Sequence, residues 1–168
     1  SPATNFAVNT TWTDATPTET NLDSVNFVNG LFLAGVYYSG GVYKYFYRST
    51  DGVTWEAETS DLTMIQGAVV GFAYGNGVYL VLGSDSSLFR STDGVTWSSV
   101  DIIDSTATYA DLAFDGDSFF LLKADGSLYK TGDGGSWSIY APLPTCGGTY
   151  TYTSLIWAST IMTGGAFI

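Results

Sequence analysis

The chain has no histidine and only one cysteine, Cys146, among its 168 residues. The absence of histidine excludes Ser-His-Asp and Cys-His catalytic centres as well as histidine-ligated zinc. A single cysteine excludes a disulfide within the chain and a cysteine-based metal cluster. We therefore expect neither a metal nor a cofactor.

Positive charge is also scarce, because 5 Lys and Arg residues stand against 16 Asp and Glu residues, a net charge of −11. Such a surface repels the phosphate backbone of nucleic acids and anionic lipids. We expect no nucleic-acid partner, and interpret the acidity as an aid to solubility.

Long apolar runs are missing as well. None approaches the roughly 18 residues that a membrane-spanning helix needs, so we expect no membrane insertion. No signal peptide is visible, and the chain begins at Ser1 rather than Met. We interpret that start as a sign of processing or of an excerpt from a longer protein.

What the chain does have is aromatic residues (16%), 20 glycines and a recurring stretch. Arg48–Trp55 returns unchanged as Arg90–Trp97 and in a weaker form as Lys130–Trp137. The aspartates of these stretches are 42 and 40 residues apart, and Trp12 lies 43 residues before Trp55. A period of about 40 residues is the size of one propeller blade.

Each stretch has the chemistry of a tight turn between two strands. The aspartate can accept hydrogen bonds from backbone amides, the glycine supplies a positive φ, and a Ser or Thr hydroxyl can bond locally. The tryptophan then begins the returning strand with a large apolar surface. We interpret these residues as structural: Ser49, Asp51, Gly52, Trp55, Ser91, Asp93, Gly94, Trp97, Thr131, Asp133, Gly134 and Trp137.

These turns resemble the Asp-box family, also called bacterial neuraminidase repeats, in a short form with one residue fewer between Asp and Trp. The resemblance implies a β-propeller with each box on the hairpin between the third and fourth strands of a blade. It implies no particular activity, because the box occurs in many proteins that share only the fold.

We predict one all-β domain over residues 1–168, a β-propeller of about four blades. The blades are expected near 24–60, 65–102, 108–140, and 150–168 together with 1–14. N- and C-terminal strands would close that last, shared blade and remove exposed sheet edges. The rival is an open half-ring that pairs with another copy.

Catalytic and metal-binding hypotheses find little support. Sialidases belong to the proteins that carry this box, and the resemblance implies that they bind their substrate with three arginines. The chain has only Arg48 and Arg90, at equivalent repeat positions. We therefore reject sialidase activity. A general glycosidase needs two carboxylates about 5–10 Å apart, whereas most acids here fall in turns and loops. Asp101, Asp104 and Asp111 could offer oxygens to calcium, but a solvated acidic loop explains them better.

The connection between the first hairpin and the first box is longer than its counterpart. Gly30 and Asp51 are 21 residues apart, against 16 for Gly77 and Asp93. The insertion is rich in tyrosine, whose ring suits a sugar or a protein partner, although alternate tyrosines also pack a longer hairpin. The candidate ligand or partner face comprises Tyr37, Tyr38, Tyr43, Tyr140 and Tyr150.

We therefore predict a non-enzymatic structural or binding module of an extracellular or virion surface. Its short strands rich in Thr, Ser, Gly and Tyr resemble those of bacteriophage tail-fibre and virion-decoration domains. The expected partners are other virion or surface proteins, or glycans, and an oligomer is compatible with the sequence. The alternative is a secreted, lectin-like carbohydrate-binding propeller, and the third candidate is a glycoside hydrolase.

Overall fold

The computed structural model describes residues 22–36, 46–58, 65, 68–102, 104, 106–142 and 154–155. Every regular element in this part of the chain is a β-strand, and the strands form three antiparallel sheets of four. The predicted fourth blade and the closure by residues 1–14 and 150–168 lie outside the described residues, except for Ser154 and Leu155.

Each sheet is a simple meander whose strands follow one another in chain order, and we call the sheets the first, second and third blade. The first blade contains β1 (Leu22–Val28), β2 (Leu31–Val36), β3 (Phe46–Ser49) and β4 (Glu56–Ala57). The second contains β5 (Val69–Gly75), β6 (Val78–Gly83), β7 (Leu88–Ser91) and β8 (Ser98–Ser99). The third contains β9 (Tyr109–Phe114), β10 (Phe119–Lys123), β11 (Ser127–Thr131) and β12 (Ser138–Pro142).

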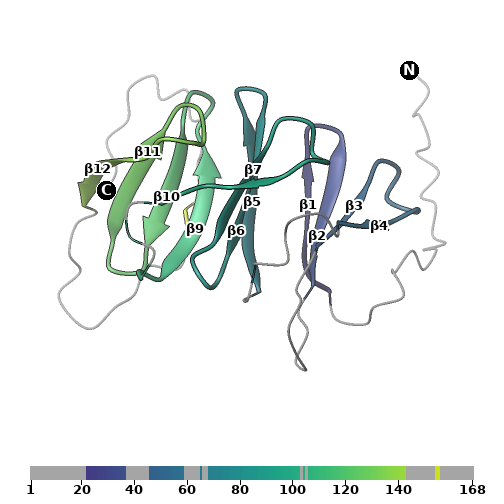
Figure 1. Ribbon diagram of the computed structural model, residues 1–168, viewed down its shortest axis with the longest axis horizontal. Coiled ribbons are helices and arrows are strands. Elements are labelled where there is room, and N and C mark those ends of the chain that lie inside the picture. Colours follow the sequence, from purple (N-terminus) through teal and green to yellow (C-terminus); the bar gives the residue numbers. More distant parts are fainter. Residues whose placement is uncertain are drawn as a thin grey trace, which may run out of the picture.

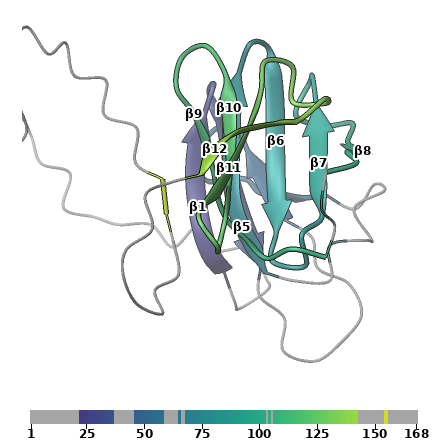
Figure 2. The same cartoon turned by 90° about the vertical axis from the view of Figure 1, so that its left-hand side faces the viewer.

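The three blades stand in a row in chain order, with the first and third at its two ends (Figure 1). Seen along the row, they lie one behind another (Figure 2). The first strand of the second blade, β5, contacts both β1 and β9. Sheets of four strands that stack face to face around their first strands are the blades of a propeller.

Tight turns of one kind set the first hairpin of the first and second blades. Asn29 and Gly30 have φ values of 49° and 77°, and Asn76 and Gly77 have 50° and 75°. Two successive residues with positive φ match the right-handed twist of the flanking strands. Asn and Gly adopt positive φ at a low energetic cost, so the Asn-Gly pair favours this turn.

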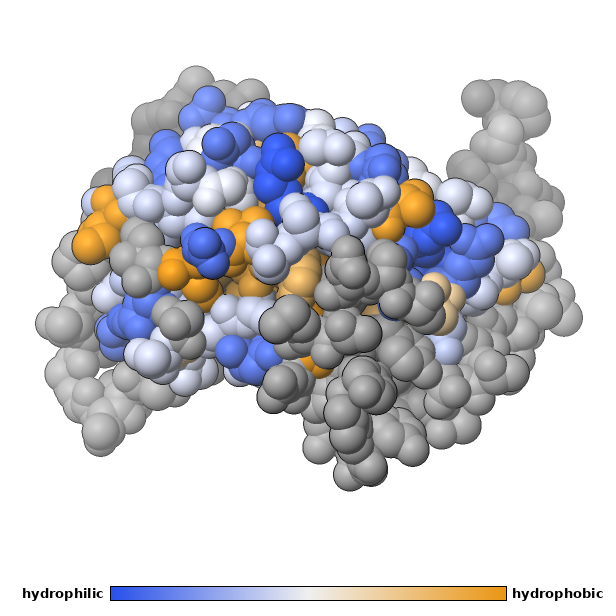
Figure 3. Space-filling view, viewed as in Figure 1, coloured by the Kyte–Doolittle hydropathy of each residue, from blue (hydrophilic) through white to orange (hydrophobic). Residues whose placement is uncertain are grey.

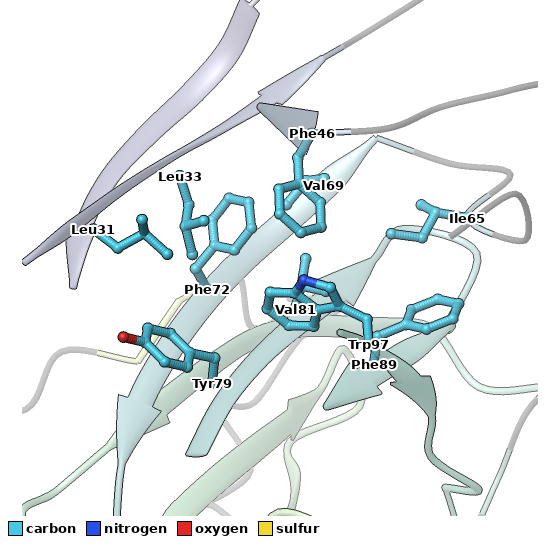
Figure 4. Packing of buried hydrophobic residues seen from close by; sticks show 10 residues of the cluster. All are labelled: Leu31, Leu33, Phe46, Ile65, Val69, Phe72, Tyr79, Val81, Phe89 and Trp97. Atoms are coloured by element: carbon cyan, nitrogen blue, oxygen red, sulfur yellow. The ribbon is translucent and has the colours of Figure 1, made fainter. Parts of the chain in front are cut away.

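Each blade has two apolar faces because successive side chains of a strand point to opposite sides. We call the face toward the following blade the front face and the other the back face. Leu31, Leu33 and Phe46 on the front of the first blade meet Phe72, Val81 and Trp97 on the back of the second (Figure 4).

The same arrangement recurs between the second and third blades. Leu80, Leu82 and Leu88 on the front of the second blade pack with Leu112 and Leu121 of the third. The three front-face leucines are at most 1% exposed. Each such side chain contributes roughly 1.5–3 kcal/mol to folding, so the contact between blades is a large source of stability.

Hydrogen bonds join neighbouring blades at the edge of this apolar contact. Asn29 Nδ2 donates to the Tyr79 hydroxyl over 2.8 Å. Asn76 Nδ2 donates to the Asp117 carbonyl oxygen at 2.8 Å and to that of Gly132 at 2.9 Å. In the first and second blades, the asparagine of the hairpin turn therefore also fixes the position of the next blade.

A glycine on β5 allows the third blade to approach closely. A Cβ on Gly75 would overlap the Phe114 ring, whereas the nearest neighbour of a Cβ on Gly71 would be Asp111 Oδ1 at 3.5 Å. Neither glycine has a positive φ, so the two positions differ mainly in the space available.

We predict that Gly75→Ala destabilises the fold by about 1–3 kcal/mol, because it forces the Phe114 ring out of its place. Gly71→Ala is the matched control, with an expected change below about 1 kcal/mol. Urea unfolding of both variants measures the difference. Equal stability of the two variants would show that the blades do not pack as closely as described.

Candidate functional site

The three turn motifs, Ser49–Trp55, Ser91–Trp97 and Thr131–Trp137, share one pattern of hydrogen bonds. In the second, the Ser91 hydroxyl accepts from the Gly94 amide at 2.8 Å and donates to Asp93 Oδ1 at 2.9 Å. Asp93 Oδ1 also accepts from the Val95 amide at 2.8 Å and the Thr96 amide at 2.7 Å. The other two motifs repeat these bonds.

This pattern holds the carboxylates in their charged form. The two backbone amides, together with the Ser or Thr hydroxyl, lower the pKa of Asp51 and of Asp133 to about 2. The same donors lower the pKa of Asp93 further. A carboxylate that is ionised at neutral pH and bonded within its own turn supports the hairpin and is poorly suited to act as a general acid.

The other singled-out acids also have partners of their own. Asp104 accepts from the Thr106 hydroxyl at 2.8 Å and pairs with Lys123 at 3.3 Å. Asp111 accepts from the Leu112 amide at 2.8 Å and the Leu155 amide at 2.6 Å. Asp101 is exposed. Within the described residues, no group of three or more His, Cys, Asp or Glu residues could hold a metal ion.

The Arg or Lys residue directly before each turn motif has a different partner in each blade. Arg90 Nε donates to the Asp133 carbonyl oxygen of the next blade at 2.9 Å. Arg48 instead pairs with Glu56 at 2.6 Å within its own blade. The third cation, Lys130, lies on the front face of the third blade at the end of the row, where a hollow opens.

This third-blade hollow has a volume of about 160 Å³ and mostly apolar walls. The Lys130 ammonium lies 5.4 Å from the centre of the Phe120 ring and 5.5 Å from that of Tyr140. The two rings meet edge to face with centres 5.3 Å apart. Tyr140 is 58% exposed. The hollow is lined by Ala113, Asp115, Phe120, Leu128, Lys130, Tyr140 and Leu155.

The repeat explains why this front face differs from the other two. By their place before the turn motif, Leu128 and Lys130 correspond to Leu88 and Arg90 of the second blade. Leu88 and its first-blade counterpart, Phe46, are at most 1% exposed because the following blade covers them, whereas Leu128 is 8% exposed and borders the hollow. Leu155 begins such a cover on the third blade, since it packs with Phe120, Leu122 and Leu128.

The back face of the first blade, at the other end of the row, is exposed along β1, while Ala34 and Tyr47 on the same face are buried and pack with Trp55. The rings of Phe27 and Phe32 also lie on this face, with centres 4.5 Å apart. Val25 and Phe27 are 63% and 62% exposed. On the surface, apolar side chains emerge in separate patches among polar residues (Figure 3).

Only one of the five tyrosines of the predicted ligand face lies among the described residues. Tyr140 lies at the third-blade hollow, whereas Tyr37, Tyr38, Tyr43 and Tyr150 lie outside the described residues. Sequence reasoning missed Phe120, Leu128 and Lys130. Their correspondence to the front-face residues of the preceding blades, read along the repeat, was the signal that could have identified them.

No family model and no curated protein matches the chain. Solved structures do match, and they show that the fold is an all-β propeller, as predicted. Two of them are YCF48 from Cyanidioschyzon merolae (TM-score 0.57) and YCF48 bound to D1 peptide (TM-score 0.58), each 20% identical to this chain. The matches cover 74% and 73% of this chain but 38% and 40% of those chains. The chain therefore matches about two fifths of the length of these propellers.

The described residues contain no helix that is long and apolar enough to cross a membrane.

We predict that stability falls as the pH drops from about 4 to 2. The pKa of Asp133 is lower in the folded chain than its usual value near 3.8, so the unfolded chain binds more protons in acid. The contribution is present above the usual pKa and is lost as the pH falls through the folded pKa. Urea midpoints measured at pH 7, 4, 3 and 2 report this loss.

Asp133→Asn removes the charge from one turn, so this variant should be less stable than the parent at pH 7 and lose less stability between pH 4 and 2. Asp101→Asn, at an exposed loop position, is the control and should follow the parent. The assignment fails if Asp133→Asn and the parent lose the same stability over this interval.

Proposed function

We propose that this chain is a non-enzymatic propeller module for protein binding or assembly, and that its third-blade hollow takes a side chain from a protein segment. The carrying observation is the hollow on the front face of the third blade, which is lined by Phe120 and Leu128, 7% and 8% exposed. At the equivalent places of the first and second blades the next blade fills this space, while here Tyr140 and Lys130 border a hollow of about 160 Å³.

The chemistry of the hollow matches a peptide better than a small polar ligand. Its apolar walls suit one aromatic or branched side chain, and burial of that chain supplies affinity. Lys130 can donate to a backbone carbonyl, as Arg90 does to the carbonyl of Asp133. A propeller of the same fold has been solved bound to a peptide, which supports a protein segment as ligand.

A role without catalysis agrees with the described acids. The turn-motif carboxylates are bonded within their own turns, and Asp104 and Asp111 bond Lys123 and backbone amides, respectively. The proposed setting is an extracellular or virion surface, with other virion or surface proteins as partners. That setting rests on the composition of the chain.

Carbohydrate binding is the second candidate, and a specific observation favours it. Tyr140, which is 58% exposed, lines the same hollow as Asp115. An aromatic face beside a hydrogen-bond acceptor is an arrangement that suits a sugar ring. The two candidates differ in the class of molecule that the hollow retains.

The test is to pan a random peptide library on phage against the intact chain, immobilised at low density so that copies do not meet. Peptides with an aromatic or branched anchor should be enriched and bind with micromolar Kd. A glycan array probed with the same preparation tests the second candidate. Enrichment of glycans without peptides would overturn the proposal in favour of a lectin-like role.

Two neighbouring residues of β12 provide a matched pair of variants. Tyr140→Ala removes the rim of the hollow and should weaken peptide binding at least about tenfold. Ile139→Ala removes a side chain that is 71% exposed and does not line the hollow, so it should leave Kd unchanged. Equal effects of the two substitutions would place the binding site elsewhere.

A further inference from the structure

The turn between the first two strands of a blade differs in the third blade. In the second blade this turn is Gly75–Gly77, and in the third blade it is Asp115–Asp117. The two stretches correspond because each ends two residues before the residue, Tyr79 or Phe119, that pairs with the first residue of the turn motif. Two carboxylates therefore stand where the second blade has two glycines.

The side-chain donor of this turn is lost with the same change. Asn29 and Asn76 donate from Nδ2 to the next blade, the first to the Tyr79 hydroxyl and the second to backbone carbonyls. Gly116 has the place of Asn76 in the third blade and has no side chain that could donate. The first and second blades thus offer a donor to their neighbour, whereas the turn of the third blade offers carboxylate acceptors.

The first of these carboxylates belongs to the wall of the third-blade hollow. Asp115 lines the hollow together with Lys130 and Tyr140. Its Oδ1 accepts from the amides of Asp117 at 2.8 Å and Ser118 at 2.7 Å, so Oδ2 takes no part in these two bonds. The Ser118 amide is the main cause of a lowered pKa at Asp115. This carboxylate is therefore charged at neutral pH.

The second carboxylate lies beside the ammonium of the hollow. The Asp117 side chain is 87% exposed, and its Oδ2 lies 3.9 Å from Lys130 Nζ. Two carboxylates thus stand against one ammonium at this rim, which leaves one negative charge without a counterpart. A second cation would balance the rim, and the net charge of −11 attracts a basic partner to the chain.

We propose that the third-blade hollow binds a basic segment of another protein, with an apolar side chain in the hollow and a neighbouring Lys or Arg on Asp115 and Asp117. The inference rests on the proposed function, that the hollow takes a protein segment. The apolar anchor supplies contact area, and the charge pair selects among segments that carry such an anchor. Arginine fits best, because its guanidinium donates several N–H groups at once to carboxylates.

This chain offers few basic residues of its own for the rim. Residues 1–21 and 143–168 contain no Lys or Arg. Lys130 belongs to the hollow itself, and Lys44 lies outside the described residues. The other three cations already bind acceptors of this chain: Arg48, Arg90 and Lys123. A partner with basic residues of its own therefore fits the rim better than a second copy of this chain does.

The first test sequences the peptides that the immobilised intact chain selects from the phage library. Lys or Arg should stand next to the apolar anchor more often than in the unselected library. Selection on Asp117→Asn should reduce this excess, because the rim loses one carboxylate. Asp101→Asn makes the same change of net charge at an exposed loop position and should keep the excess. Selected peptides without an excess of basic residues overturn the inference.

The second test needs no variant of the protein. One selected peptide is synthesised with arginine at its basic position and, as the matched control, with citrulline, which has nearly the same shape and no charge. The arginine form should bind about two- to fivefold more tightly, the range of a charge pair at an exposed rim. High salt should shrink this difference. Fluorescence anisotropy measures the four values of Kd, and equal Kd for both peptides at low salt contradicts the inference.

A double-mutant cycle then locates the basic residue on the protein. On Asp117→Asn, the change from arginine to citrulline should weaken binding less than on the parent. On Asp101→Asn, it should weaken binding as much as on the parent. The same loss on all three proteins would place the basic residue away from this rim and overturn the assignment.

The outcomes separate this inference from the proposed function. Peptides that bind in a Tyr140-dependent way without a preference for Lys or Arg leave the function standing and overturn the basic-segment assignment. A preference for Lys or Arg that is coupled to Asp117 supports both. A selection that enriches no peptide overturns both.

Discussion

A blade of this protein has two apolar faces and can bury neither of them alone. The second blade, between two neighbours, has every residue of β6 buried. In the first blade, Val25 and Phe27 on β1 are more than half exposed. Stability in such a chain is approximately a sum over neighbouring repeats. Within the described strands, the large apolar side chains that stay exposed are Val25 and Phe27 on β1 and Ile139 and Tyr140 on β12, in the two blades at the ends of the row.

The turn motif is the local sequence feature that positions one blade against the next. One carboxylate oxygen accepts two backbone amides and fixes the turn, so the outer strand starts with its tryptophan in a defined place. In the second blade that place is against Phe46 of the preceding blade. A short stretch of polar residues thereby sets the contact between two sheets, while the apolar faces provide most of the free energy.

The blades and their first hairpins could be predicted from the sequence because the repeat shows them. The spacing of the aspartates predicts the blades, and Asn-Gly predicts the first hairpins, with positive φ at Asn29 and Gly30. The hollow could not be read in the same way. Leu128 is a core residue by type and pattern, and the structure buries it at 8% exposed, as it buries Leu88 at 1%. Only the hollow beside it makes it a candidate site, and that is a tertiary property.

The same reasoning explains why the candidate function lies at the ends of the row rather than in the turn motifs. Three equivalent motifs in three blades place their aspartates apart, each bonded within its own turn, so they do not converge on one substrate. An end face, in contrast, already has the shape and the hydrogen-bonding groups of a blade interface. Under the proposed function, the partner presents what a neighbouring blade presents, an aromatic side chain beside a backbone carbonyl. The proposed binding face then needs no residues beyond those that already form a blade interface.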